Sequence, residues 1–201
     1  SALQVNNEYC ADMMKYFVQE ADQKGIAIKS AEKYEEQASD FRTQLTKVRT
    51  DKTNAVFLCG YYQDSGLLLK QARELGIAAQ FFGVTTIENP ALIEAGGKAV
   101  ERIIYTTSPV NCQGGALFCS DFEAAYGITP DYRAAYAYDA LSILASAIKN
   151  VGDDPEKLKT ELLTIEHTGA SGLTKFDEKG NAQKTFILKT VKDGAFVEYQ
   201  E

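Results

Sequence analysis

The sequence predicts an α/β fold built on a parallel sheet. Two short apolar runs, residues 55–58 and 79–82, flank a stretch whose leucines recur at helical spacing and which ends at Gly76. Such a run suits a strand buried on both faces, and two strands joined by a helix form a βαβ unit with parallel strands. The carboxyl ends of these strands share one edge, where open α/β sheets bind ligands. Residues 60–62 and 83–86 are therefore expected at that edge.

The flanking elements follow the same alternation of strand and helix up to residue 107. Residues 2–5 are expected to form a strand, residues 11–23 a helix, and residues 26–29 the start of the next strand. A helix over residues 40–48 begins at the capping pair Ser39-Asp40. Asn89-Pro90 opens another helix, because proline is well placed at the first helical position. Residues 103–106 form the strand that ends this section.

After residue 107 the sequence becomes mainly helical. A turn-rich linker over residues 108–115 precedes predicted helices at residues 118–126, 131–150 and 154–165. The long helix carries an apolar face made of Ala137, Leu141, Leu144, Ala145 and Ile148. Residues 176–181 indicate a turn, and residues 185–191 and 195–199 a hairpin around Asp193-Gly194.

The composition is that of a globular protein, with 45% hydrophobic and 24% charged residues among 201. A net charge of −7 argues against nucleic acid as a partner, because phosphates require a basic face. No run approaches the roughly 18 apolar residues that a membrane-spanning helix needs.

The cysteines do not indicate a metal site. Cys112 and Cys119 flank a short loop with two glycines, so they could form a disulfide in an oxidising compartment; two reduced thiols are the alternative. The single histidine, His167, is distant in sequence and no Cys-x-x-Cys pair occurs. We expect neither a metal nor a cofactor.

Several segments resemble the branched-chain amino-acid receptor family, the type I periplasmic solute-binding proteins. They occur in the family's order and cover nearly the whole chain: residues 7–9, 40–47, 60–61, 69–76, 82–86, 136–141 and 172–180. The resemblance implies the type I periplasmic-binding-protein fold. Residues 1–107 and 184–201 would form the second lobe, with a parallel sheet in three layers, and residues 108–183 the returning, mostly helical part of the first lobe.

The resemblance also implies a truncated chain that lacks the N-terminal part of the first lobe. The absence of an export signal then carries no information about the compartment. The apolar face of the helix at residues 131–150 would lack the sheet on which it normally packs. Because large exposed apolar patches are uncommon, we expect that face to pack on the first section of the chain or to form a homodimer.

Tyr9 and Tyr61 match tyrosines that contact the ligand in the family, and each offers a flat apolar face and a hydroxyl. The alternative is that they are rim or partly buried tyrosines. Thr85 and Thr86 stand in the loop where amino-acid-binding relatives carry an acidic residue for the ligand's ammonium group. A hydroxyl cannot compensate a desolvated positive charge. The carboxylates nearest in sequence that could do so are Glu8, Asp64 and Glu88.

The resemblance implies a receptor without enzymatic activity that delivers a small solute to the permease of an ABC importer. The solute would be an amino acid or a related carboxylate or amide, bound in an interlobe cleft that closes by hinge motion. The compartment would be the periplasm, or the cell surface by a lipid anchor in a Gram-positive organism. The alternative is a sensing module of the same fold that controls a signalling partner.

The residues themselves give little support to an enzyme. No Gly-x-Ser-x-Gly elbow, phosphate loop or dinucleotide fingerprint occurs. His167 has no neighbouring nucleophile pattern and is expected in a surface turn. Asp139 is expected on a solvated helix face or at a cap.

Overall fold

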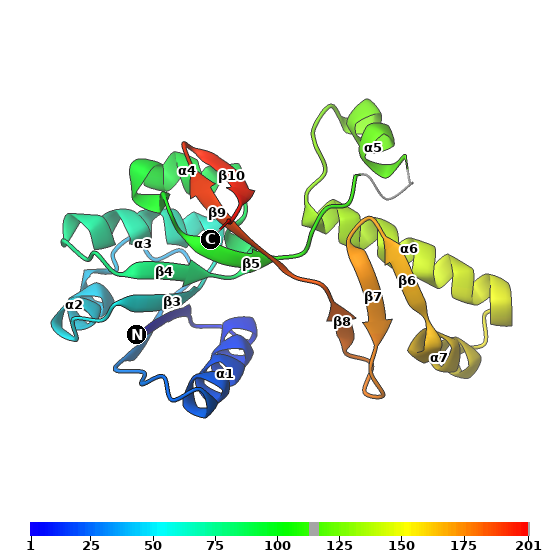
Figure 1. The fold of residues 1–201 in the computed structure, drawn as a ribbon, viewed down its shortest axis with the longest axis horizontal. Helices are drawn as coiled ribbons and strands as arrows, with labels where there is room; N and C mark the ends of the chain where they lie inside the picture. The colour runs from blue at the N-terminus through cyan, green and yellow to red at the C-terminus, as the bar shows by residue number, and fades with distance from the viewer. Residues whose placement is uncertain (113–116, 201) are drawn as a thin grey trace. The chain divides into compact units, whose positions relative to one another are not determined.

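The computed structural model describes residues 1–112 and 117–200, which form two compact units (Figure 1). Unit 1 comprises Ser1–Thr106 and the chain from Leu188 onwards, and unit 2 is Thr107–Ile187. The sequence placed the two changes of unit at residues 107/108 and 183/184. Unit 2 is therefore a continuous insertion into the chain of unit 1.

Unit 1 is built on a seven-stranded sheet with the order β10-β9-β5-β4-β3-β1-β2. Its strands are β1 (Ala2–Val5), β2 (Ala31–Tyr34), β3 (Ala55–Cys59), β4 (Gln80–Gly83), β5 (Ile104–Thr107), β9 (Ile187–Lys192) and β10 (Ala195–Glu198). The pairs β1–β2, β1–β3, β3–β4 and β4–β5 are parallel, which confirms the predicted parallel sheet. β9 and β10 form the predicted antiparallel hairpin.

Helices cover both faces of this sheet (Figure 1). They are α1 (Glu8–Gln23), α2 (Arg42–Thr50), α3 (Tyr62–Glu74) and α4 (Pro90–Gly96), with short 3-10 helices η1 (Thr85–Ile87) and η2 (Gly97–Val100). Phe57 points away from its buried neighbours Val56 and Leu58 because side chains alternate along a strand. Its ring stacks on Phe17 of α1 with 4.2 Å between ring centroids. α1 therefore lies on the face opposite α3 and α4.

The strand predicted at residues 26–29 is wrong, and β2 forms at Ala31–Tyr34 instead. β2 lies at the edge of the sheet, where a strand needs few apolar residues, and among its four residues only Tyr34 is buried. Ile26 is 58% exposed. Ile26 and Ile28 line a surface hollow of about 390 Å³ beside Phe17 and Phe57, which accounts for the apolar pattern that suggested a strand.

Unit 2 combines three helices with a small sheet. The helices are α5 (Phe118–Tyr126), α6 (Tyr132–Val151) and α7 (Pro155–Thr164), at the predicted places. The antiparallel sheet has the order β6-β7-β8, with β6 (Glu166–Gly169), β7 (Gly172–Phe176) and β8 (Ala182–Lys184). Of this sheet, the sequence predicts only the turn between β7 and β8, because these strands are short and largely polar.

The apolar face predicted for α6 is exposed. Leu141 is 69% exposed, and Leu144 and Ile148 are also exposed. The helix buries a different set on its other side: Tyr132, Ala135, Asp139, Ile143 and Ala147. The core of unit 2 thus uses the face of α6 opposite to the predicted one.

The expectation that Asp139 lies on a solvated helix face or at a cap is wrong, because Asp139 lies inside α6 on its buried side. Its side chain is buried, with 2% of the residue exposed, and accepts hydrogen bonds from the backbone of Ala170 and Ser171 at 2.7 Å and from the Ser171 hydroxyl. His167, expected in a surface turn, lies in β6 with its Nε2 3.6 Å from a carboxylate oxygen of Asp139. Asp139 therefore fixes the turn between β6 and β7 onto α6.

Candidate functional site

The carboxyl ends of four strands of unit 1 meet at one edge of the sheet. Val5 pairs with Tyr34, Gln4 with Cys59, and Leu58 with Gly83. The segments that follow these strands are residues 6–10, 35–37, 60–64 and 84–88, and we call the surface that they form the carboxyl edge. All four residues predicted to bind a ligand lie on it.

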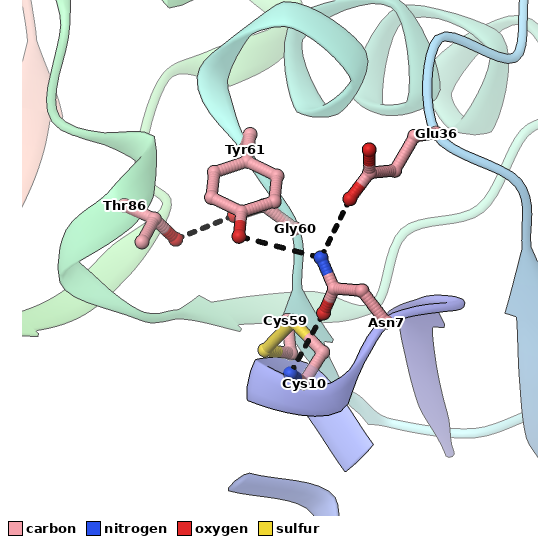
Figure 2. Close-up of a disulfide and its surroundings, with 7 residues drawn as sticks. All are labelled: Asn7, Cys10, Glu36, Cys59, Gly60, Tyr61 and Thr86. Atoms are coloured by element: carbon pink, nitrogen blue, oxygen red, sulfur yellow. Dashed lines mark hydrogen bonds between the residues drawn. A yellow bond between two sulfur atoms is a disulfide. The ribbon is translucent and has the colours of Figure 1, made fainter. Parts of the chain in front are cut away.

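Asn7 connects three of these segments. Its side-chain oxygen accepts the backbone N–H of Cys10 at 3.0 Å, which makes Asn7 the N-cap of α1. Its Nδ2 donates to the Glu36 carboxylate at 2.8 Å and to the Tyr61 hydroxyl at 3.3 Å, as Figure 2 shows. Asn7 therefore sets the position of Tyr61 relative to α1.

Tyr61 is half-buried and is the residue before α3. The residue on its N-terminal side, Gly60, accepts a hydrogen bond of 2.6 Å from the Thr86 hydroxyl through its carbonyl oxygen (Figure 2). A Cβ atom at Gly60 would overlap with the hydroxyl of Tyr34. Only glycine therefore fits at this point of the carboxyl edge, and the backbone before Tyr61 is held from two sides.

Tyr9 and Thr85 lie on the same edge at the starts of two helices. Tyr9 is the second residue of α1 and is 40% exposed. Thr85 is the first residue of η1 and is half-buried, next to Thr86. The structure thus brings the two predicted tyrosines and the two predicted threonines to one surface, and their contact with a ligand stays a prediction.

Two disulfides occur among the described residues, and only one of them was expected as a possibility from the sequence. Cys112 and Cys119 are joined within unit 2. The second disulfide joins Cys10, in the first turn of α1, to Cys59, the last residue of β3 (Figure 2). Both of these residues are fully buried. A signal was present in the sequence, because each of the two cysteines stands within two residues of a predicted ligand tyrosine.

The three carboxylates considered for an ammonium group differ in their surroundings. Glu88 forms an ion pair with Lys189 of β9, and Glu8 is exposed in the first turn of α1. Asp64 is only 5% exposed. Burial, with a smaller contribution from the nearby negative charge of Glu36, raises its pKa above the ordinary value, although a hydrogen bond from the backbone of Gln37 acts in the opposite direction.

A hollow of about 430 Å³ lies beside Tyr61, lined by Glu36, Gln37, Gln63 and Asp64 as well as the tyrosine. The carboxyl edge therefore combines an aromatic wall with two carboxylates. Sequence reasoning missed Glu36, which follows an edge strand that was expected earlier in the chain.

Within residues 1–112 and 117–200, no group of three or more His, Cys, Asp or Glu side chains is arranged to hold a metal ion. None of the described helices is both long enough and apolar enough to cross a membrane.

Comparison with known proteins gives a consistent set of relatives. A family model described as "Periplasmic binding protein" matches residues 2–195. A leucine-, isoleucine-, valine-, threonine- and alanine-binding protein of Pseudomonas aeruginosa is 28% identical over 145 residues, which cover 71% of this chain and 39% of the relative. The chain thus spans well under half the length of the curated relatives that it matches.

Solved structures with the same fold cover almost the whole chain. A leucine-binding protein from Thermotoga maritima matches with a TM-score of 0.89 and 28% identity, over 99% of this chain and 59% of that protein. A solute-binding protein of an ABC transporter from R. palustris, solved in complex with benzoate, matches with a TM-score of 0.82 over 98% of this chain and 56% of that protein. At 20% identity the second likeness shows the fold alone.

Proposed function

This chain belongs to the periplasmic binding protein family, and on that premise we propose that it is part of an extracytoplasmic receptor that binds a small solute for an ABC importer. In this proposal unit 1 is the second lobe and unit 2 the returning part of the first lobe. The named relatives are binding proteins, so we infer a receptor without enzymatic activity, which hands its solute to a membrane permease. Solute binding would shift the population between open and closed lobes.

The observation that carries the proposal is the chain of contacts at the carboxyl edge. Asn7 donates a hydrogen bond to the Tyr61 hydroxyl, and the Thr86 hydroxyl donates one to the carbonyl oxygen of Gly60, the residue before Tyr61. Ligands of open α/β sheets bind outside the carboxyl ends of the strands. We propose that Tyr9 and Tyr61 provide the aromatic wall of one side of the binding cleft, and that Thr85 and Thr86 bind polar groups of the solute.

The hydrogen bonds already present restrict what each hydroxyl can offer. The single O–H proton of Thr86 points to Gly60, so Thr86 offers a solute its oxygen lone pairs and would face an N–H or O–H donor. The Tyr61 hydroxyl oxygen accepts a hydrogen bond from the side-chain amide of Asn7, which leaves its own O–H to donate to an acceptor such as a carboxylate. A solute with both a donor and an acceptor, such as an amino acid or an amide, fits this arrangement.

An ammonium group would need a negative charge that Thr85 cannot supply. Lys189 already opposes the charge of Glu88. Glu36 and Asp64 line the hollow beside Tyr61, and we propose that these two carboxylates, rather than Glu88, face an amino acid's ammonium group. A small carboxylate without an ammonium group would not need them.

The test is a nuclear magnetic resonance titration of the 201-residue chain with L-leucine and with benzoate. We expect at least one of the two to shift the backbone signals of residues 7–10, 60–64 and 84–88 at millimolar concentration. Neutralising Glu36 and Asp64 to glutamine and asparagine should abolish shifts by L-leucine and leave shifts by benzoate. Signal changes confined to other parts of the chain, or none with either compound, would overturn the assignment of the carboxyl edge.

A further inference from the structure

The disulfide between Cys10 and Cys59 lies directly behind the two tyrosines of the carboxyl edge. Cys10 follows Tyr9 in the first turn of α1, and Cys59 is two residues before Tyr61. Both cysteines are fully buried, while Tyr9 and Tyr61 are partly exposed on the edge itself. The bond therefore joins, from the inside, the two segments that carry the aromatic wall (Figure 2).

The parallel ladder alone does not hold these segments together. The register between β1 and β3 runs only from Ala2↔Phe57 to Gln4↔Cys59. Val5 still pairs with Tyr34 of β2, and after it the chain leaves the sheet and enters α1. Beyond the ladder, the 3.3 Å hydrogen bond between Asn7 and the Tyr61 hydroxyl links the two segments at the edge itself. Side-chain hydrogen bonds at a surface exchange readily with water, whereas a covalent bond does not.

The disulfide between Cys112 and Cys119 differs from the one between Cys10 and Cys59 in ways that make it a control. Cys112 and Cys119 are 7 residues apart and join two points of one short segment of unit 2. Cys10 and Cys59 are 49 residues apart and join the first turn of α1 to the last residue of β3. The bond between Cys112 and Cys119 restrains its own short segment, whereas the bond between Cys10 and Cys59 fixes the position of one element relative to another.

We propose that Cys10 and Cys59 are positioning residues: their disulfide sets the direction of the first turn of α1 against the end of β3, and so the separation of Tyr9 and Tyr61. This inference rests on the proposed function for the role of the two tyrosines. The restraint itself is a property of unit 1 that is measurable without any solute.

The test compares two double variants by hydrogen exchange of the native chain. Cys10→Ala/Cys59→Ala removes the disulfide at the carboxyl edge, and Cys112→Ala/Cys119→Ala removes the other. The reporters are three backbone amides at the starts of α1 and α3. Those of residue 10 and Ala11 donate to Asn7, and that of Ser65 donates to the carbonyl oxygen of Tyr61. The strand β4 is the reference for the core of unit 1.

We expect exchange at the three reporters to become faster on the order of tenfold in Cys10→Ala/Cys59→Ala, with β4 little changed. In Cys112→Ala/Cys119→Ala the reporters should exchange as in the parent chain. Unchanged reporters in the first variant, or an equal rise in β4, would overturn the proposal, since the bond would then be only a general stabiliser of unit 1.

A second measurement covers the case in which Cys10→Ala/Cys59→Ala does not fold. The folded variant Cys112→Ala/Cys119→Ala retains a single disulfide, which a water-soluble phosphine can reduce. The phosphine becomes its oxide, water supplies the oxygen atom and two protons, and both sulfurs become thiols. The same local rise at the reporters is expected after reduction, and a rise across all of unit 1 would again overturn the inference.

The outcomes separate this inference from the proposed function. If neither L-leucine nor benzoate shifts the signals of the carboxyl edge, the proposed solute site fails, and the exchange data still decide whether the disulfide restrains the edge. If one of the two compounds binds, Cys10→Ala/Cys59→Ala should lower the affinity for that compound about tenfold, and Cys112→Ala/Cys119→Ala should leave the affinity unchanged. Equal affinity of the parent and of Cys10→Ala/Cys59→Ala would show that the tyrosines need no such positioning.

Discussion

The hydroxyl of Thr86 donates a hydrogen bond of 2.6 Å to the carbonyl oxygen of Gly60, which joins the loop after β4 to the loop after β3. Gly60 precedes Tyr61, so this bond fixes the backbone from which the Tyr61 side chain extends. The carboxyl edge of unit 1 is thus held by contacts between loops that are 26 residues apart in sequence.

Thr86→Val removes that hydrogen bond with little change of shape. We expect a loss of about 1 kcal/mol in the free energy of unfolding, measured by urea denaturation. Thr46→Val is the matched control, because Thr46 is exposed and its hydroxyl donates to the carbonyl of Arg42 within its own helix, α2. Equal losses in the two variants would contradict a special role for the bond to Gly60.

Asn7→Ala should cost about 1 kcal/mol of stability as the loss of an N-cap and should also release Tyr61. Asn89→Ala removes an equivalent cap from α4, where the side chain accepts from Ala91, and should cost a similar amount without affecting Tyr61. Amide exchange in the first turn of α3 distinguishes the two. The hypothesis fails if Asn89→Ala loosens that turn as much as Asn7→Ala does.

Tyr61→Ala should weaken binding of whichever of L-leucine and benzoate binds, by about 1–3 kcal/mol, because an apolar wall is lost. Tyr16→Ala, at an exposed site of α1, is the control and should leave affinity unchanged. We also expect weak binding by the parent chain, because it carries only part of the relatives' length. Calorimetry that gives micromolar or tighter affinity for the parent chain would contradict this second expectation.

Asp64→Asn should stabilise the chain at neutral pH. Burial raises the pKa of Asp64 above its ordinary value, so the folded chain binds this proton more readily than the unfolded chain does. The resulting stability is complete below the ordinary carboxyl pKa of about 4 and is lost as the pH rises through the folded pKa. The melting temperature of Asp64→Asn should therefore exceed that of the parent at pH 7, and the difference should shrink towards pH 3.

Asp12→Asn, at an exposed position of α1, controls for the loss of one negative charge. A gain in melting temperature that is the same at pH 3 and pH 7, or equal in the two variants, would argue against the titration of a buried carboxyl group.

The exposed face of α6 should cause the chain to self-associate. Leu141, Leu144 and Ile148 are all exposed on one side of the helix, and contiguous apolar surface favours burial against a second copy. We expect light scattering to give a mass above that of the monomer, and Leu141→Asp/Leu144→Asp to restore the monomer. Ser146→Asp, on another side of α6, is the control. A monomeric parent chain at high micromolar concentration would rule the association out.

The sequence was sufficient for strands with a continuous apolar run. β3 and β4 were predicted from such runs, and Val56, Leu58 and Phe81 are fully buried on one face of the sheet, whereas Phe82 on the other face is 39% exposed. β2 and β6 were missed or misplaced because an edge strand or a half-exposed strand has no such run, and its position depends on the partner strand rather than on its own residues.

The same distinction applies to the carboxyl edge. The four predicted residues could be placed there because parallel strands share one carboxyl end. The roles of Asn7 and Glu36 could not be predicted, because they depend on strand order. β1 lies between β2 and β3 in the sheet, and no local pattern in the sequence indicates that order.

The insertion of unit 2 has a consequence for the chain during its synthesis. β5 and β9 are neighbours in the sheet, but residues 108–186 lie between them. At about 5–20 residues per second, a ribosome needs roughly 4–16 seconds to deliver β9 after β5, and meanwhile β5 is an unpaired edge open to other chains. Unit 2, which is continuous, is complete before the unit that surrounds it. The nascent chain therefore finishes its inserted part first and closes its own sheet last.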